Sequence, residues 1–195
     1  PDAYVGSPIA ELFEVNLVLT SSVVVRRDAL GRVGGFDETL PLAEDLELWI
    51  RLARDGPAAV SPLALLRYQH RADGLSQQVE RRLLGDVELF GRLAADPGLT
   101  PALRRRARRR RALARYKLAI EALRDGDADR ARRHLLVAWH FPGRILPVAA
   151  TWLASLLPAG SLRRLHRRSP VSRELGRRFI SHRRVRLAAS GRDLP

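Results

Sequence analysis

Two neighbouring segments decide the fold of this chain: Gly34–Glu38, with the sequence GGFDE, and Leu42–Leu52, with the sequence LAEDLELWIRL. From the second segment onward, apolar residues recur with the spacing of one face of an amphipathic helix: Leu46, Trp49, Ile50 and Ala53. Gly56 and Pro57 then stop the pattern. The sequence therefore predicts a glycine turn followed by a helix over Glu44–Asp55 that buries one face.

The predicted helix begins with two carboxylates, those of Glu44 and Asp45. Acidic residues are favourable at a helix N-terminus, where the aligned peptide dipoles leave a partial positive charge, so capping alone explains them. A carboxylate at the end of a turn is also placed to face a cleft and to accept a proton from a substrate hydroxyl. Taken alone, the residues leave both roles open.

Around this helix, short apolar runs predict a small number of strands. Two runs rich in β-branched residues read as strands buried on both faces, Asn16–Leu19 and Ser22–Val25. Further strands are expected at Ala58–Val60 and Ala64–Tyr68, a helical turn at Arg27–Val33, and a loop over Pro1–Leu12. Residues 1–80 are thus predicted to be an α/β fragment.

The rest of the chain, residues 81–195, reads as an all-α, arginine-rich helical region. Helical periodicity predicts helices over Glu80–Ala95, from Thr100 to Leu123, over Ala128–Phe141, over Ile145–Leu157 and over Ser172–Leu187. Thr100 is expected to cap its helix, with Pro101 at the first helical position. The second and third of these helices resemble one tetratricopeptide-type hairpin, although such repeats need about three copies for a continuous core.

Charge divides the chain in the same place. The net charge is +14; residues 1–80 hold 7 arginines and 12 acidic residues, a net −5, so the remainder carries +19. There is no cysteine, which excludes disulfides and thiolate metal sites. No run reaches the ~20 apolar residues that span a bilayer. Such asymmetry indicates that the two halves face different surroundings.

The run Arg104–Arg111 allows three interpretations: a solvated helix face, a contact with an anionic membrane surface, or a contact with nucleic acid. The apolar segment Ile145–Leu153 is too short to cross a bilayer but could lie flat beside such a surface. Nucleic acid is the least favoured of the three, because few aromatic residues accompany the arginines. An arginine-rich helical binding module is therefore the alternative function for residues 81–195.

The order of these features resembles the C-terminal half of a family-2 glycosyltransferase catalytic domain, over about Asn16 to Ser76. The matching pieces are Thr20–Ser22, Arg26, Gly34–Glu38, Glu44–Asp45, Leu48–Arg51, Gly56 and His70–Ser76. The resemblance implies a partial GT-A-like layer and transfer of a sugar, with inversion, from a nucleotide sugar to a hydroxyl of a glycan or lipid-linked acceptor. It also implies a place in the cytoplasm or at the inner face of the plasma membrane.

The resemblance assigns roles to residues of the helix and the turn. Asp45 matches the catalytic base, and Glu44 either binds acceptor hydroxyls or only favours the helix end. The turn that borders the substrate cleft supplies Gly35, Phe36 and Asp37 as candidate substrate-binding residues, together with Trp49 on the helix. Phe36 itself is expected in the core, and Asp37 is expected to hydrogen-bond its own turn.

A divalent metal, Mg²⁺ or Mn²⁺, is expected for a complete enzyme of this family. His70 is the candidate ligand here, with a surface-loop histidine as the alternative, and Arg67 or Arg71 would contact the diphosphate. The acidic Asp-x-Asp motif that binds metal in the family does not occur before Gly34, and the downstream strings at 125–129 lie in a helical turn. The sequence therefore predicts acceptor-side residues without a donor site, and an exposed apolar sheet edge.

Overall fold

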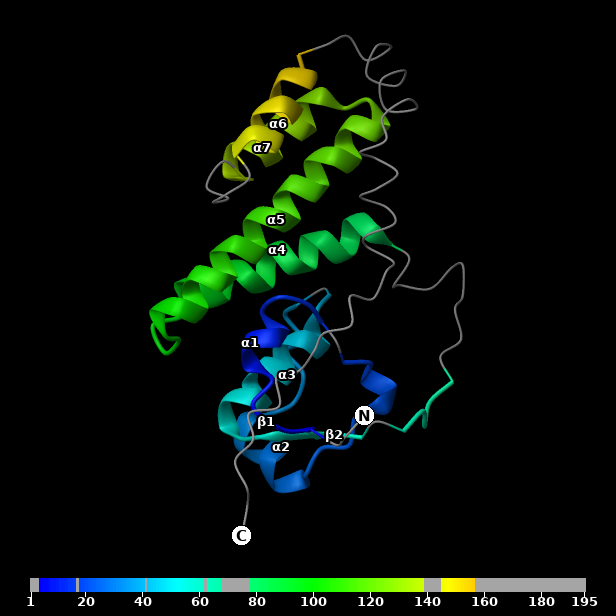
Figure 1. Cartoon of the computed structure of the whole chain (residues 1–195), viewed down its shortest axis with the longest axis vertical. Helices are drawn as coiled ribbons and strands as arrows, with labels where there is room; N and C mark the ends of the chain where they lie inside the picture. Colours follow the sequence, from blue (N-terminus) through cyan, green and yellow to red (C-terminus); the bar gives the residue numbers. More distant parts are fainter. Residues whose placement is uncertain are drawn as a thin grey trace.

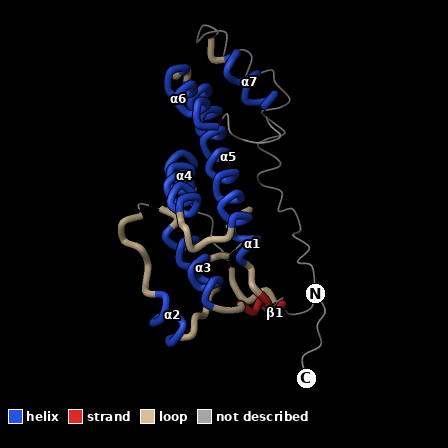
Figure 2. Tube along the Cα trace, turned by 90° about the vertical axis from the view of Figure 1, so that its left-hand side faces the viewer, coloured by secondary structure: helices blue, strands red, loops and turns tan. Residues whose placement is uncertain are grey.

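The computed structural model describes residues 4–16, 18–40, 42–61, 63–67, 78–138 and 145–156. In chain order the elements are β1 (Tyr4–Gly6), α1 (Ile9–Leu12), the 3₁₀ turn η1 (Thr20–Ser22), α2 (Arg27–Val33), α3 (Glu44–Asp55), β2 (Ala58–Val60), α4 (Val79–Ala95), α5 (Pro101–Asp125), α6 (Ala128–Ala138) and α7 (Ile145–Ala154). Figures 1 and 2 both place α6 and α7 at the end of the molecule away from α2 and β1.

Helix α3 has the bounds that its sequence predicts, Glu44–Asp55. Its first turn is acidic and its last turn holds Arg54, in keeping with the helix dipole. The apolar face is buried: Leu46, Leu48, Trp49, Ile50 and Ala53 are each at most 9% exposed. The start of α3, where Glu44 and Asp45 lie, is thus fixed by the burial of the helix behind it.

One hydrophobic core joins the N-terminal elements to the long helices. It contains Leu12 and Phe13 from the α1 region, the buried face of α3, and residues of α4 and α5 that include Phe90 and Ala107. The rings of Phe13 and Phe90 meet edge to face, with centroids 5.8 Å apart. In Figure 1 the α4–α5 pair accordingly lies across α1 and α3.

The strands differ from the prediction. Tyr4–Gly6 forms β1 and pairs antiparallel with β2, Tyr4 opposite Val60, and α1 follows, so the expected loop over Pro1–Leu12 is wrong. The expected strands at Asn16–Leu19 and Ser22–Val25 are also wrong: their described residues form no strand, and Thr20–Ser22 is a 3₁₀ turn.

Local hydrogen bonds explain the missing strands. The side-chain oxygen of Asn16 accepts from the Val18 N–H at 3.2 Å, and the Ser22 hydroxyl donates to the Leu19 carbonyl at 2.7 Å. Such short-range bonds occupy backbone groups that a sheet would otherwise pair. Val24 is consequently 99% exposed rather than buried.

The remaining strand predictions have mixed outcomes. Ala58–Val60 is confirmed as β2, whereas residues 64–67 have no strand structure, and Tyr68 lies outside the described residues. Val5 on β1 and Val60 on β2 are 64% and 47% exposed, whereas the exposed edge expected from missing parallel strands stays a prediction. A sheet of two three-residue strands buries little surface, so α3 and the helices hold this region together.

The helical half follows its sequence closely. The Thr100 hydroxyl accepts from the Leu103 N–H at 3.3 Å, and Pro101 is the first residue of α5. Gly126 ends α5 with φ +85°, a conformation that glycine adopts without strain. Helices α5 and α6 then pack through a cluster that includes Tyr116, Ala131 and Leu135. Ser172–Leu187 lies outside the described residues.

Helix α7 packs on this hairpin with one face. Val148 is buried in the α5–α6 cluster, and the hydroxyls of Tyr116 and Thr151 lie 3.3 Å apart. Trp152, Leu153 and Leu156 remain exposed. Within the part of the chain that the structure describes, no helix combines the length and the apolar character that a membrane span requires.

Candidate active site

The candidate site lies at the start of α3. Ala43, the residue before the helix, has φ +68° and ψ +18°, the left-handed conformation, which is uncommon for a residue with a side chain. It is the one non-glycine residue with positive φ among the residues the structure describes. This sharp turn sets the direction in which Glu44 and Asp45 leave the backbone, and such strained positions often occur at functional sites.

Asp45 is half-buried and is held by neutral donors. The Thr20 hydroxyl donates to Asp45 Oδ2 at 3.1 Å, and the Asn16 side-chain amide donates to the same oxygen at 3.4 Å. Asp45 Oδ1 lies 2.6 Å from the backbone nitrogen of Leu46. Ion pairs among the described residues do not include Asp45. Within the described residues, the carboxylate is therefore oriented without a cation to neutralise it.

Glu44 also lies at the helix start and is partly exposed. Unlike Asp45, it makes no hydrogen bond or ion pair with another residue of the described ranges. Its carboxylate is available to a ligand, and it contributes a favourable charge at the helix N-terminus. Both roles that the sequence predicts for Glu44 thus fit its position.

Arg51, further along α3, connects the helix to the glycine turn through hydrogen bonds. Its guanidinium donates to the carbonyls of Val33, Gly34 and Gly35, at 2.6 Å for Gly35, and to the carboxylate of Glu47 at 2.6 and 2.7 Å. Gly34 itself has φ +84°, which favours glycine. Arg51 is not among the predicted site residues, although its place in the matching piece Leu48–Arg51 is a signal that could have identified it.

The carboxylate of Asp37 is committed to the turn. Asp37 Oδ1 accepts from the hydroxyl and the N–H of Thr39, at 2.6 and 2.9 Å, and Oδ2 pairs with Arg92 of α4 at 3.1 Å. These hydrogen bonds from Thr39, together with the charge of Arg92, lower the pKa of Asp37. The expected hydrogen bonding of Asp37 within its own turn is confirmed.

Phe36 is not in the core, contrary to the prediction. Its ring is 51% exposed and meets Trp49 edge to face, with centroids 6.5 Å apart. Trp49 takes the buried place, at 7% exposure, and its indole N–H has no partner among the described residues. The turn leaves Gly35 exposed beside Phe36. Phe36, rather than Trp49, is the aromatic ring that solvent and ligands can reach.

Of the residues expected to bind the diphosphate and the metal, the structure describes one, Arg67. Arg67 is exposed, and His70 and Arg71 lie outside the described residues. Among the described residues, no three histidine, aspartate or glutamate side chains come close enough to bind a metal ion. A full set of ligands for Mg²⁺ or Mn²⁺, which favour oxygen, is therefore not assembled among the described residues.

The N-terminal part of the chain matches a known family. Residues 3–96 match the model of the family described as glycosyltransferase like family 2. The resemblance that the GGFDE turn and the Glu44–Asp45 pair indicate is therefore confirmed for this part of the chain. The matched region ends at the close of α4, so it includes Arg92 as well as the α3 site.

Two curated relatives share a shorter stretch. They are the pre-mycofactocin glycosyltransferases of two Mycobacterium tuberculosis strains, CDC 1551 / Oshkosh and H37Rv, each 36% identical over 66 residues. The aligned part is 33% of this chain, and this chain spans only 14% of the length of these relatives. No solved structure matches the chain.

Proposed function

We propose that residues 3–96 form the acceptor side of a family-2-type glycosyltransferase, with Asp45 as its catalytic base. The observation that carries the proposal is the Asp45 carboxylate, oriented by Thr20 and Asn16 and not paired with a cation in the described structure. The family match of residues 3–96 and the glycosyltransferase name of the relatives support it.

In the proposed reaction, Asp45 accepts the proton of an acceptor hydroxyl while the hydroxyl oxygen bonds to the anomeric carbon of the donor sugar. The bond from that carbon to the donor phosphate breaks on the opposite side, and the nucleoside diphosphate leaves with the electron pair. One displacement of this kind inverts the anomeric carbon. General-base assistance is typically worth about 10²–10⁴-fold in rate.

The other residues of the site have supporting roles. Glu44 is the candidate partner of further acceptor hydroxyls, and the exposed ring of Phe36 offers a flat apolar surface to a sugar. Arg51 keeps the glycine turn and α3 in register through three carbonyls. Thr20 and Asn16 orient Asp45, and such orientation contributes to catalysis by reducing the motion needed to reach the reacting geometry.

The donor side of the enzyme is proposed from the family resemblance and not from the described residues. A nucleotide sugar, a glycan or lipid-linked acceptor, a divalent metal and a location in the cytoplasm or at the inner face of the plasma membrane follow from the family resemblance. A divalent metal would neutralise charge on the leaving diphosphate. The proposed proton transfer to Asp45 does not involve this metal.

The proposal is tested by replacing Asp45 in the polypeptide encoded by the complete gene. Asp45→Asn keeps the shape of the side chain and one acceptor oxygen but removes the proton acceptor. We expect turnover to fall about 10²–10⁴-fold while donor affinity stays unchanged. Glu44→Gln is expected to cost less and to act on acceptor affinity. A capping role alone would instead lower stability by about 1 kcal/mol and leave turnover near normal.

A further inference from the structure

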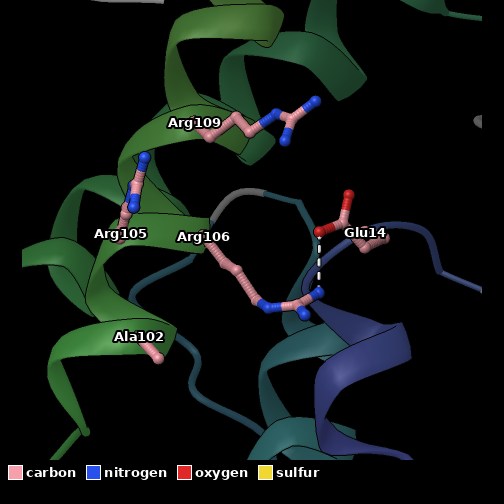
Figure 3. A pocket seen from close by; sticks show the side chains of 5 residues that line it. All are labelled: Glu14, Ala102, Arg105, Arg106 and Arg109. Carbon is pink, nitrogen blue, oxygen red and sulfur yellow. Dashed lines mark hydrogen bonds and ion pairs between the residues drawn. The ribbon is translucent and has the colours of Figure 1, made fainter. Parts of the chain in front are cut away.

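A basic pocket lies beside the site, between α5 and the end of α1. Its volume is about 320 Å³, and it is lined by Glu14, Ala102, Arg105, Arg106 and Arg109. Figure 3 shows the three arginines and Glu14 around the hollow, with Ala102 below them on α5. The small side chain of Ala102 leaves the space open on the helix face that carries the arginines.

The pocket has an excess of positive charge. Its lining holds three arginines, whose guanidinium groups stay protonated at any physiological pH, and one carboxylate, that of Glu14. Arg106 pairs with Glu14 at 2.9 Å, but the two side chains are 44% and 52% exposed, and such ion pairs contribute little to stability. A more highly charged anion can therefore replace Glu14 as the partner of Arg106.

The arginines are placed to act together. Arg105 and Arg109 are four residues apart on α5 and so share one face of the helix, with Arg106 next to them. Guanidinium groups bind phosphate oxygens through two parallel N–H donors, a geometry that lysine lacks. A cluster of three such groups around a hollow of this size matches a phosphate or diphosphate group better than it matches a carboxylate.

The pocket and the α3 site are also connected by a short stretch of chain, from Glu14 to Asn16. Glu14 lies two residues before Asn16, so their Cα atoms are at most about 7 Å apart. Asn16 in turn donates to Asp45. An anion in the pocket would thus lie close to the segment that orients the proposed base.

We propose that Arg105, Arg106 and Arg109 form a binding site for a phosphate or diphosphate group, with Glu14 as the internal carboxylate that the ligand displaces. The ligand is either a soluble phosphate compound or the phosphate monoester headgroup of a lipid. This site lies outside the acceptor-side residues described above. Its test measures binding alone, so its outcome is independent of the transfer reaction.

The test measures binding of sodium pyrophosphate by calorimetry at fixed ionic strength, on the 195-residue chain. The double variant Arg105→Gln/Arg109→Gln is expected to weaken binding at least about tenfold, because it removes charge-assisted hydrogen bonds. The matched control is Arg104→Gln/Arg108→Gln, which removes the same charge with the same spacing from the same helix. The control should change affinity less than about twofold, since these two arginines do not line the pocket.

A variant that is expected to strengthen binding, rather than weaken it, provides an independent test. Glu14→Gln removes the competing carboxylate and is expected to strengthen pyrophosphate binding, whereas Glu121→Gln, the same charge change on α5 but outside the pocket lining, should have a smaller effect. Circular dichroism checks that each variant is folded. The variants also show whether an effect belongs to the pocket or to the total charge of the chain.

A second arm identifies the source of the phosphate. Sedimentation with phosphatidylcholine vesicles, with and without phosphatidic acid, measures binding to a lipid phosphate monoester. Loss of vesicle binding in the Arg105/Arg109 variant but not in the control, without pyrophosphate binding, indicates a lipid headgroup. Selective loss of pyrophosphate binding indicates a soluble ligand. Absence of binding to either probe, or equal losses in variant and control, would overturn the proposal.

Discussion

The glycine turn, residues 34–39, and the start of α3, residues 43–45, both present an aspartate, but the two carboxylates have opposite surroundings. In the turn, Asp37 pairs with Arg92 and accepts two hydrogen bonds from Thr39. At the helix start, Asp45 is held by the neutral side chains of Thr20 and Asn16. A carboxylate paired with a cation is a weak proton acceptor, so the difference separates structure from chemistry.

The same contrast holds for the backbone. The turn is fixed by Arg51, whose guanidinium is shared among three carbonyls and Glu47. The helix start instead holds its shape at Ala43, which carries a conformation that is unfavourable for alanine. The stabilising hydrogen bonds are thus in the turn, and the strained backbone is at the start of α3. This agrees with a functional site at the start of α3.

The largest stability effect should come from the turn. Arg51→Met keeps the aliphatic part of the side chain but leaves three carbonyls and the half-buried Glu47 without their donor. We expect the free energy of unfolding to fall by about 2–3 kcal/mol, measured by urea denaturation. Arg26→Met is the control, because Arg26 is 83% exposed and, among the described residues, pairs with Asp28 alone; its effect should stay below about 0.5 kcal/mol. Equal losses in the two variants would contradict the role given to Arg51.

A smaller effect, on activity, should come from Thr20. Thr20→Val preserves the shape of the side chain but removes the hydroxyl that orients Asp45. A hydrogen bond to a charged acceptor is worth at least about 1.5 kcal/mol, so turnover of the enzyme from the complete gene should fall about tenfold. Thr39→Val removes the equivalent hydroxyl from Asp37 and should leave turnover unchanged. If Thr39→Val lowers turnover as much as Thr20→Val does, the two regions do not differ in function.

Relief of the strain at Ala43 should be measurable and favourable. Ala43→Gly removes the clash of the side chain in the left-handed conformation, and part of this gain is offset by the greater freedom of glycine in the unfolded chain. We expect the free energy of unfolding to rise by about 0.5–1 kcal/mol. Ala150→Gly, at an exposed position inside α7, should lower it by about 1 kcal/mol. A loss of stability in Ala43→Gly would show that the conformation carries no strain.

The smallest expected effect is the loss of stability at low pH when Asp37 is protonated. The pKa of Asp37 is lowered by the hydrogen bonds from Thr39 and the charge of Arg92. Its contribution to stability is therefore fully present above the pKa of an unfolded aspartate, about 3.9, and is lost as the pH falls through the lower folded value. Carbon-13 shifts of the Asp37 carboxyl should show titration below that of a free aspartate. In Thr39→Val the midpoint should move upward, and an unchanged midpoint would exclude Thr39 as the cause.

Much of this molecule can be read from its sequence, for physical reasons that also explain the failures. Helix α3 is predictable because its period, acidic start and Gly56 stop all agree. The strands at Asn16–Leu19 and Ser22–Val25 are not, because hydrogen bonds from Asn16 and Ser22 to nearby backbone compete with a sheet. Apolar composition alone does not reveal that competition.

The site shows the same limit. Asp45 is found from its place at a helix start within a family pattern. Its partners Thr20 and Asn16 lie 25 and 29 residues away, and Arg92 reaches Asp37 across 55 residues. Such contacts depend on how the elements pack, which periodicity does not encode. The exposure of Phe36 escapes prediction for the same reason, since its ring lies outside the core, against the buried Trp49.

The most direct test of the account compares Asp45→Asn with Asp37→Asn in the enzyme from the complete gene, under single-turnover conditions with saturating donor. The account predicts that Asp45→Asn lowers the transfer rate about 10²–10⁴-fold with little change in melting temperature. It predicts the reverse for Asp37→Asn: a lower melting temperature and a near-normal rate in the folded protein. An Asp45→Asn enzyme that retains most of its transfer rate would contradict the central claim.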